Sequence, residues 1–340
     1  MHADPVRTAR KAEHLDAAAS PDAVHRGASG LDEVRLRHRA LPGRDLAQVD
    51  LAANLLGQRL GAPVIVSAMT GGSEASRGVN VELLEAATEH GAAMILGSSR
   101  ALLDEPGLVG TYRPCAARPP LLLANLGASH LVQGLTADQA LRVVELLDAD
   151  GLALYLNPLQ EAVQPEGHPE LGGAIELIAD LVERLAPLPV LVKEIGFGLD
   201  PDDVALLADA GVAAVDVAGA GGTNWALVEG LRDDDARALA APFSTWGTPT
   251  AEALRDAVRV AGLRVPVIAS GGVRDGVDVA RCLALGASAA GIARPMLLAA
   301  RAGTAQAALG TLVEQLRVAT WCAGAAAARD LGPEHLRPTA

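Results

Sequence analysis

Pro266-Val-Ile-Ala-Ser-Gly-Gly-Val-Arg274 joins an apolar run to a glycine-rich exit. Pro266 favours an extended approach without removing a ladder hydrogen bond, and Val267–Ser270 has the composition of a buried strand. An amphipathic stretch, Val277–Leu285, follows, and Gly286 supplies a left-handed helix end before a second apolar run, Ala289–Ala293. This order predicts a strand–helix–strand unit with parallel strands.

The same unit recurs along most of the chain. Eight apolar runs fit a strand: Val64–Ala68, Ala93–Leu96, Leu121–Asn125, Leu152–Leu156, Val190–Lys193, Ala213–Val217, Val267–Ser270 and Ala289–Ala293. Proline and glycine alternate just before them, as Pro63, Gly91, Pro120, Gly151, Pro189, Gly211, Pro266 and Gly286. A two-unit period repeated four times predicts an α/β fold, a single (β/α)8 TIM barrel. A doubly wound open sheet is less favoured, because the chain has eight strands and lacks an N-terminal Gly-x-Gly-x-x-Gly.

Three parts of the chain are expected outside this rhythm or at its edges. Residues 1–60 form an N-terminal extension, with order expected only from Leu31 onward, and contribute to the substrate site. Residues 61–328 form the barrel, and residues 329–340 a loose C-terminal tail. The connection Ala218–Thr248, after the sixth strand, has a length typical of lids and binding loops.

Composition excludes several classes of function. A net charge of −13 argues against a nucleic-acid partner, whose binding needs a broad basic surface. No apolar run reaches membrane-spanning length, and the charged N-terminus lacks the apolar region of a secretory signal. The three cysteines, Cys115, Cys282 and Cys322, fit neither a disulfide framework nor a zinc site, so we expect a cytosolic protein.

The carboxyl ends of the predicted strands hold the residues that could do chemistry, since barrels of this kind carry their sites there. Gly271 and Gly272, after the seventh strand, would let backbone N–H groups approach a phosphate closely. Arg274 and Arg294 would add charge-assisted donors at the same place. The plainer alternative is a tight turn without a ligand.

Lysine is rare in this chain, with only Lys11 and Lys193 among 28 basic residues. Lys193 is predicted at the end of the fifth strand, where a compact positive charge could stabilise an anionic flavin or a developing carbanion. Lys11 lies in the cationic run Arg10-Lys11-Ala-Glu-His14, which would otherwise be a solvated charge run. With Arg100 after the second strand, this run suggests a second anion site, separate from the one near Arg274.

Asn157, Gln160 and Glu161 follow the fourth strand within five residues. Pro158 ends the strand, so these side chains are expected at its exit. Two amides and a carboxylate form an oxygen-rich pocket for a hydroxyl, a phosphate or a hard divalent cation. The alternative is a polar loop that satisfies its own backbone.

Together these residues resemble the type 2, FMN-dependent isopentenyl-diphosphate isomerases over nearly the whole chain. The Arg10-Lys11…His14 start and the Asn157-Pro-Leu-Gln-Glu-Ala-Val-Gln-Pro-Glu-Gly167 run are the specific motifs. The glycine-rich pieces are shared across FMN barrels. The resemblance implies isomerisation of isopentenyl diphosphate to dimethylallyl diphosphate by proton addition and abstraction, with reduced FMN, Mg²⁺, NAD(P)H as reductant and a homo-oligomeric assembly.

The resemblance also implies site residues. It implies that Gln160 and Lys193 are catalytic and that Glu161 binds the metal. Substrate binding falls to Arg10, Lys11, His14, Ser98, Arg100, Asn157 and Gln160. Cofactor binding falls to Ala68, Met69, Thr70, Ser98, Asn125, Lys193, Thr223, Gly271, Gly272, Arg274, Ala293 and Arg294.

Two residues depart from the family pattern. Tyr155 stands where the family usually has His, and a phenol does not carry positive charge near neutral pH. Ala218 stands where Ser is common. Two alternatives remain open: an FMN-dependent 2-hydroxyacid oxidase or dehydrogenase, although the sixth strand exit has no His as general base, and a non-catalytic flavin or isoprenoid-diphosphate binding protein.

Overall fold

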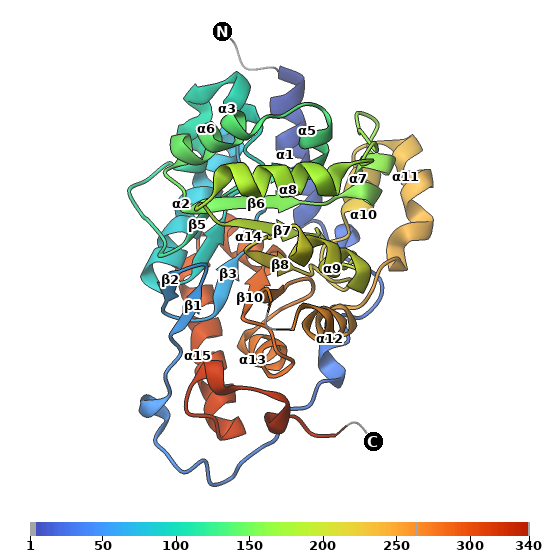
Figure 1. Ribbon diagram of the computed structural model, residues 1–340. Helices are drawn as coiled ribbons and strands as arrows, with labels where there is room; N and C mark the ends of the chain where they lie inside the picture. Colours follow the sequence, from blue (N-terminus) through green and yellow to red (C-terminus); the bar gives the residue numbers. More distant parts are fainter. Residues whose placement is uncertain (1–4, 263, 339–340) are drawn as a thin grey trace.

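The computed structural model describes residues 5–262 and 264–338, with the backbone alone for residues 5–10 and 12 (Figure 1). Eight parallel strands form a closed barrel in the order β10-β3-β4-β5-β6-β7-β8-β9. Their bounds are β3 (Val64–Val66), β4 (Ala93–Ile95), β5 (Leu122–Gly127), β6 (Gly151–Tyr155), β7 (Val190–Lys193), β8 (Ala214–Asp216), β9 (Val267–Ala269) and β10 (Ala289–Ile292). The (β/α)8 barrel predicted from the sequence is therefore confirmed.

Helices follow each strand and cover the outside of the barrel. They are α2 (Glu74–Glu89), α3 (Ala101–Asp104), α4 (Val109–Tyr112), α5 (Ala128–Val132), α6 (Ala137–Leu147), α7 (Pro158–Val163), α8 (Ala174–Leu185), α9 (Pro201–Asp209), α10 (Trp225–Gly230), α11 (Asp234–Ala240), α12 (Thr250–Ala261), α13 (Gly276–Ala284), α14 (Arg294–Arg301) and α15 (Ala305–Ala323). The long connection after β8 thus contains α10 and α11. No described helix is long and apolar enough to cross a membrane.

Alternation along the strands separates two apolar clusters. Val64, Met94 and Val190 are among the residues that face the helices, whereas Ile65 and Leu191 are among those that fill the barrel. The antiparallel hairpin of β1 (Ala53–Leu55) and β2 (Gln58–Leu60) packs Leu55 and Leu60 into this interior cluster. The barrel is therefore filled by small and branched side chains and is not a pore.

Three of the four glycines predicted to end a helix have the left-handed backbone that such an end requires. Gly91, Gly211 and Gly286 have positive φ values of 61°, 79° and 105°. Gly151 differs, because it is the first residue of β6 and a Cβ there would lie 2.7 Å from the Pro189 carbonyl oxygen. Asp148, with φ 48°, supplies the left-handed end of α6 instead.

Helix α1 (Pro5–Ala19) was not expected, because we predicted order only from Leu31 onward. It contacts α10 and α14, and its last turns bury Leu15 and Ala18 in the main core. Tertiary packing thus determines this helix, which propensity alone did not reveal.

The C-terminal segment is tied to the N-terminal one. Leu336 forms an antiparallel bridge with Leu36, and the backbone N–H of Arg37 donates to the His335 carbonyl at 2.8 Å. The structure therefore differs from the loose tail that we predicted for residues 329–340. The glycine and proline content gave no sign of this pairing.

Candidate functional site

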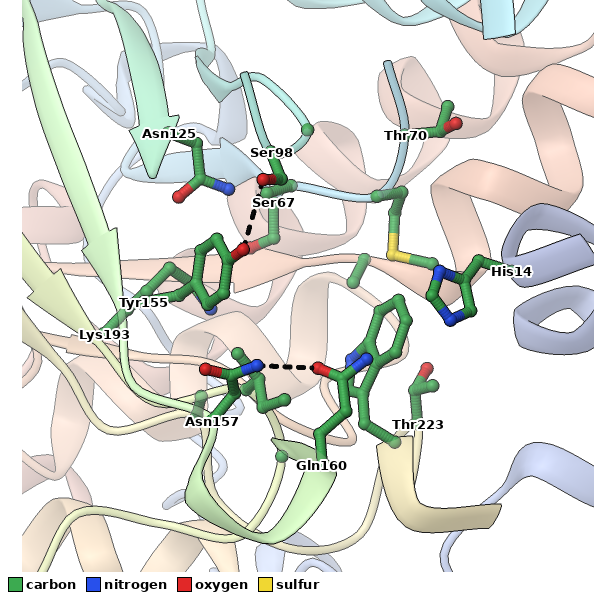
Figure 2. A pocket seen from close by; sticks show the side chains of 18 of the residues that line it. His14, Ser67, Thr70, Ser98, Asn125, Tyr155, Asn157, Gln160, Lys193 and Thr223 are labelled. Carbon is green, nitrogen blue, oxygen red and sulfur yellow. Dashed lines mark hydrogen bonds between the residues drawn. The ribbon is translucent and has the colours of Figure 1, made fainter. Parts of the chain in front are cut away.

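A cavity of about 670 Å³ opens at the carboxyl ends of the barrel strands (Figure 2). That volume lies within the range of small-molecule and cofactor sites. Exits of all eight strands contribute lining residues, and α1 adds Lys11 and His14. Every predicted site residue except Arg10 lines it; the Arg10 side chain lies outside the described residues.

The floor of the cavity follows from the period of the strands. Counting two residues beyond the last apolar interior residue of each strand gives one further layer, which we call the interior polar layer. Its members are Ser67, Gly97, Asn125, Tyr155, Lys193, Asp216, Ser270 and Gly291. All of them except Asp216 line the cavity, so the barrel interior changes from apolar to polar where the cavity begins.

Five polar atoms of residues that line the cavity are buried and, among the described residues, have no hydrogen-bond partner. They are Ser67 Oγ, Asn125 Oδ1, Asn157 Oδ1, Thr223 Oγ1 and Arg294 Nε. A buried polar atom without a partner costs free energy, so these atoms favour a polar ligand. The residues present therefore fit a flavin ring, which has both donors and acceptors along its edge.

Glycine backbones form the opposite end of the cavity. Gly271 has φ 96°, and a Cβ there would lie 1.9 Å from the Gly219 carbonyl oxygen. Gly272 has φ 67°, and Thr250 Oγ1 donates to the Gly271 carbonyl at 2.5 Å. Ala293, at the start of α14, and the orphaned Nε of Arg294 face the same region. A phosphate fits this loop and helix start.

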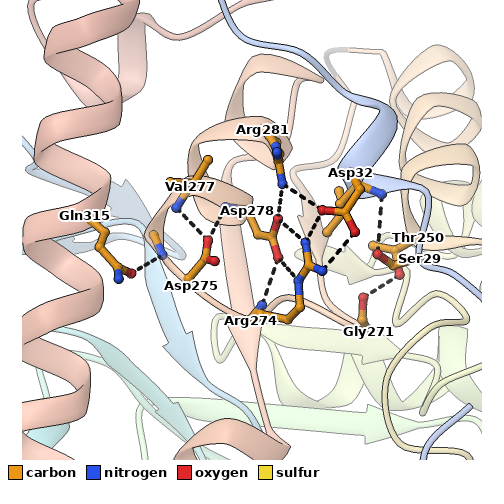
Figure 3. Close-up of polar contacts among 12 residues, drawn as sticks. Ser29, Asp32, Thr250, Gly271, Arg274, Asp275, Val277, Asp278, Arg281 and Gln315 are labelled. Atoms are coloured by element: carbon orange, nitrogen blue, oxygen red, sulfur yellow. Dashed lines mark hydrogen bonds and ion pairs between the residues drawn. The ribbon is translucent and has the colours of Figure 1, made fainter.

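The Arg274 guanidinium is already engaged (Figure 3). It donates to both carboxylate oxygens of Asp32, at 2.9 and 2.5 Å, and its Nε donates to Asp278 at 2.7 Å. Arg281 also donates to Asp278, at 2.7 Å. Two arginines thus form ion pairs with two aspartates. The sequence did not predict that the Arg274 guanidinium would be bound to carboxylates rather than to a phosphate. Arg294 is the less neutralised cation at this end.

Helix α1 supplies the other wall. Lys11 Nζ donates to the carbonyl oxygens of Gly71 and Ser98, at 2.5 and 3.0 Å, and to Tyr112 Oη at 2.8 Å. Arg100, which lines the same wall, donates to Asp104 at 3.0 Å. The sequence predicted that Lys11 and Arg100 would share a second anion site, and in the structure both line the same wall of the cavity, next to the exit of β4.

The amide cluster follows β6 and lies at the start of α7. Asn157 Nδ2 donates to Gln160 Oε1 at 3.1 Å and to Glu161 Oε1 at 2.9 Å. Its Oδ1 is buried and has no partner among the described residues. Glu161 also accepts the backbone N–H of His168 at 2.8 Å. The loop is therefore internally bonded and keeps one buried oxygen that has no partner among the described residues.

Glu229, on α10, joins this cluster to α1. It is fully buried and accepts from Gln160 Nε2 at 2.6 Å and from Arg232 at 2.5 Å, while His14 Nε2 lies 2.9 Å from it. Burial alone would raise the pKa of Glu229, but the His14 and Gln160 hydrogen bonds and the Arg232 charge lower it below its usual value. Glu229 therefore orients His14 and Gln160 as an anion. The His14 ring also meets the Trp225 ring edge-on at 5.9 Å.

Two buried carboxylates flank Lys193. Burial raises the pKa of Glu194 to about 7, against backbone hydrogen bonds from Phe197 and Gly196. Burial also raises the pKa of Asp216, opposed by the Lys193 charge and the Ser270 hydroxyl. Lys193 Nζ donates to the Glu194 carbonyl at 2.5 Å.

The two departures from the family pattern both lie at the cavity. Tyr155 Oη lies 3.1 Å from Ser98 Oγ, and the Tyr155 ring meets His130 edge-on with centroids 6.5 Å apart. Gly127 makes room for the phenol, since a Cβ there would lie 2.9 Å from it. Ala218 has φ 38°, a left-handed value that is unfavourable for alanine and clusters at functional sites.

Glu229, Asp216 and Ser67 were missed by sequence reasoning. Ser67 and Asp216 could have been found by extending the two-residue period beyond Ile65 and Ala214. Glu229 follows Trp225 by four residues, on the same helix face, but nothing in the sequence tied that face to His14.

Within the described residues, no group of three or more histidine, cysteine or acidic side chains is placed to hold a metal ion. Glu161 supplies one carboxylate, and Asn157, whose Nδ2 donates to that carboxylate, supplies one oxygen without a partner among the described residues. That set fits Mg²⁺, which often binds through one or two carboxylates together with water and substrate phosphates.

Comparison with known proteins agrees with this geometry. The family model described as FMN-dependent dehydrogenase matches residues 8–103 and 163–338. The isopentenyl-diphosphate delta-isomerase of Stutzerimonas stutzeri is 46% identical over 326 residues, covering 93% of each chain. That of Methanothermobacter thermautotrophicus is 43% identical, covering 95% of this chain and 90% of its own.

Solved structures share the fold at lower identity. Mandelate oxidase with (S)-2-phenylpropionate has a TM-score of 0.65 at 20% identity, covering 96% of this chain and 97% of its own. A flavocytochrome b2 mutant with benzoylformate has a TM-score of 0.68 at 17% identity, covering 96% and 82%. These likenesses show the barrel alone. From the family match and the relatives above 40% identity, the chain belongs to the FMN-dependent dehydrogenase family and, within it, to the type 2 isopentenyl-diphosphate delta-isomerases.

Proposed function

We propose that this protein converts isopentenyl diphosphate to dimethylallyl diphosphate, with FMN and Mg²⁺ bound in the cavity. The observation that supports this most directly is that residues of α1 and of α7 line one cavity together. Lys11 and His14 of α1 line the same cavity as the amide cluster of α7 and the buried polar atoms that have no partner. A cavity of about 670 Å³ with these linings has room for a cofactor and a charged substrate side by side.

The reaction moves a double bond by one position, so one carbon gains a proton and another loses one without net redox change. Reduced FMN, formed with NAD(P)H, would supply the group that gives and takes the proton. Ser67, Asn125, Lys193 and Thr223 would hold its ring, while Gly271, Gly272, Arg294 and the α14 start would hold its phosphate. The remaining predicted cofactor residues, Ala68, Met69, Thr70, Ser98, Arg274 and Ala293, line the same cavity.

The diphosphate would lie against the wall that Lys11 and Arg100 share. The hydrogen bonds to Glu229 and Asn157 fix the Gln160 amide, so its face is presented to the alkene in one orientation. Glu161, with the Asn157 oxygen, would hold Mg²⁺, which would offset the negative charge of the diphosphate.

A hydroxyacid oxidase would need a general base at the β8 exit. Ala220 stands in that loop, and its backbone is bonded to Thr248 and Thr250. Residues 218–225, which form this exit, contain no histidine and so supply no general base of that kind. A cytosolic location and a homo-oligomeric assembly stay predictions from the sequence.

The test is turnover by the photoreduced holoprotein with isopentenyl diphosphate and Mg²⁺, followed by NMR of the product. Glu161→Gln should abolish Mg²⁺-dependent turnover and leave FMN bound. Glu170→Gln, at an exposed carboxylate between α7 and α8, is the matched control and should keep full turnover. A protein that binds FMN but never forms the isomer would instead be a non-catalytic binding protein.

A further inference from the structure

Asp216 is a fully buried carboxylate to which the reaction above assigns no part. It is the last residue of β8, and its Cα pairs with that of Lys193 on β7. Residues in register on neighbouring parallel strands point to the same side of the sheet, so both side chains belong to the interior polar layer. They are the two charged members of that layer.

The Asp216 carboxylate lies directly beneath the cavity. Its Oδ1 accepts from Ser270 Oγ at 2.7 Å and from the backbone N–H of Ala218 at 3.1 Å, and both of these residues line the cavity. Its Oδ2 is buried and has no hydrogen-bond partner among the described residues. Half of the carboxylate is thus held in place, while the other oxygen remains unsatisfied.

Charge compensation between neighbouring strands is strong in such surroundings. Asp216 is completely buried and Lys193 nearly so, so water screens their interaction only weakly and the field of Asp216 reaches Lys193 and any ring above it at a lower effective dielectric constant. Burial is the largest effect on the pKa of Asp216 and raises it, and the Lys193 charge is the largest of the effects that oppose this rise.

We propose that Asp216 is the counter-ion of Lys193 and that it sets the reduction potential of the flavin bound in this cavity. The inference rests on the proposed function only in taking FMN as the ligand. Reduction adds negative charge to the ring, which Lys193 favours and Asp216 opposes. Asp216 is therefore a positioning residue that limits how strongly Lys193 stabilises the reduced cofactor.

The experiment measures the midpoint potential of bound FMN in the purified holoprotein and its variants. Asp216→Asn keeps the shape and an acceptor for Ser270 and Ala218 but removes the charge. We expect FMN to stay bound and reduced FMN to be favoured over oxidised by about tenfold more, a positive shift of ~30 mV for the two-electron couple.

Glu194→Gln is the matched control. Glu194 is an equally buried carboxylate next to Lys193 in the chain, but it follows the interior position and its Oε2 accepts the backbone N–H groups of Gly196, Phe197 and Gly198. Its potential shift should be the smaller of the two. Equal shifts, or an unchanged potential in Asp216→Asn, would overturn the proposal.

Ser270→Ala provides a second measurement that does not depend on Asp216→Asn folding. Loss of the Ser270 hydroxyl leaves the carboxylate charge less compensated, so the potential should move in the opposite, negative direction. A positive shift or none would overturn the proposal. A wild-type protein without bound flavin would overturn it together with the proposed function, whereas bound flavin without isomerase turnover would refute the proposed reaction alone.

Discussion

Glu194 should make the stability of this protein depend on pH in a way that one substitution removes. Burial raises its pKa from 4.5 to about 7, because the charged form loses more hydration than its backbone partners return. A folded-state pKa above the unfolded one means that the stabilisation is fully present below pH 4.5. It is then lost as the pH rises to about 7.

The size of the effect follows from the same values. Each pH unit between the two pKa values changes the free energy of unfolding by about 1.4 kcal/mol, so the wild type loses about 3 kcal/mol between pH 4.5 and pH 8 relative to a chain with an uncharged side chain there. Glu194→Gln should therefore gain stability relative to wild type as the pH rises.

Urea unfolding of both holoproteins at pH 5 and pH 8, with the same excess of FMN, measures this difference. Other titrating groups are common to the two proteins and cancel. Glu74→Gln, at an exposed surface carboxylate, is the control and should stay within about 0.5 kcal/mol of wild type. A Glu194→Gln difference that is the same at both pH values would refute the burial argument.

Three further changes test other parts of the site. Glu229→Gln should raise the substrate KM about tenfold and lower stability by about 2 kcal/mol, because one buried charge-assisted hydrogen bond network loses its anion; kinetics and urea unfolding measure both. Gly271→Ala should lose bound FMN, since its Cβ meets a backbone oxygen at positive φ, whereas Gly303→Ala, with open space around it, should keep normal flavin absorbance. Tyr155→Phe should raise KM about fivefold, for ~1 kcal/mol of lost hydrogen bonding near Ser98, and an unchanged KM would remove Tyr155 from the substrate site.

Local sequence patterns were sufficient for the barrel because each strand carries its own signal. Val64–Val66 and Val190–Lys193, for example, are buried along their whole length. Continuous apolar runs of this kind are typical of parallel strands that are covered on both faces. The cavity residues at strand ends follow from that assignment, since the fold places all carboxyl ends at one rim.

Features that depend on tertiary contacts could not be predicted in the same way. Helix α1 depends on packing against α10 and α14, and Glu229 acquires its role only because that packing brings His14 beside it. The sequence motif predicts that Arg274 binds a phosphate, but in the structure its guanidinium donates to Asp32, more than 200 residues away in the chain. Long-range partners of this kind leave no periodic trace in the chain.

Helix α1 has a consequence for how such enzymes change over time. The residues proposed to hold the flavin follow the barrel strands, whereas Lys11 and His14 come from a separate segment that packs on α10 and α14. Part of the proposed substrate site is therefore encoded in a different stretch of the gene from the proposed flavin site. Exchanging the terminal segment between homologous barrels offers a route to new substrates that leaves the redox apparatus intact.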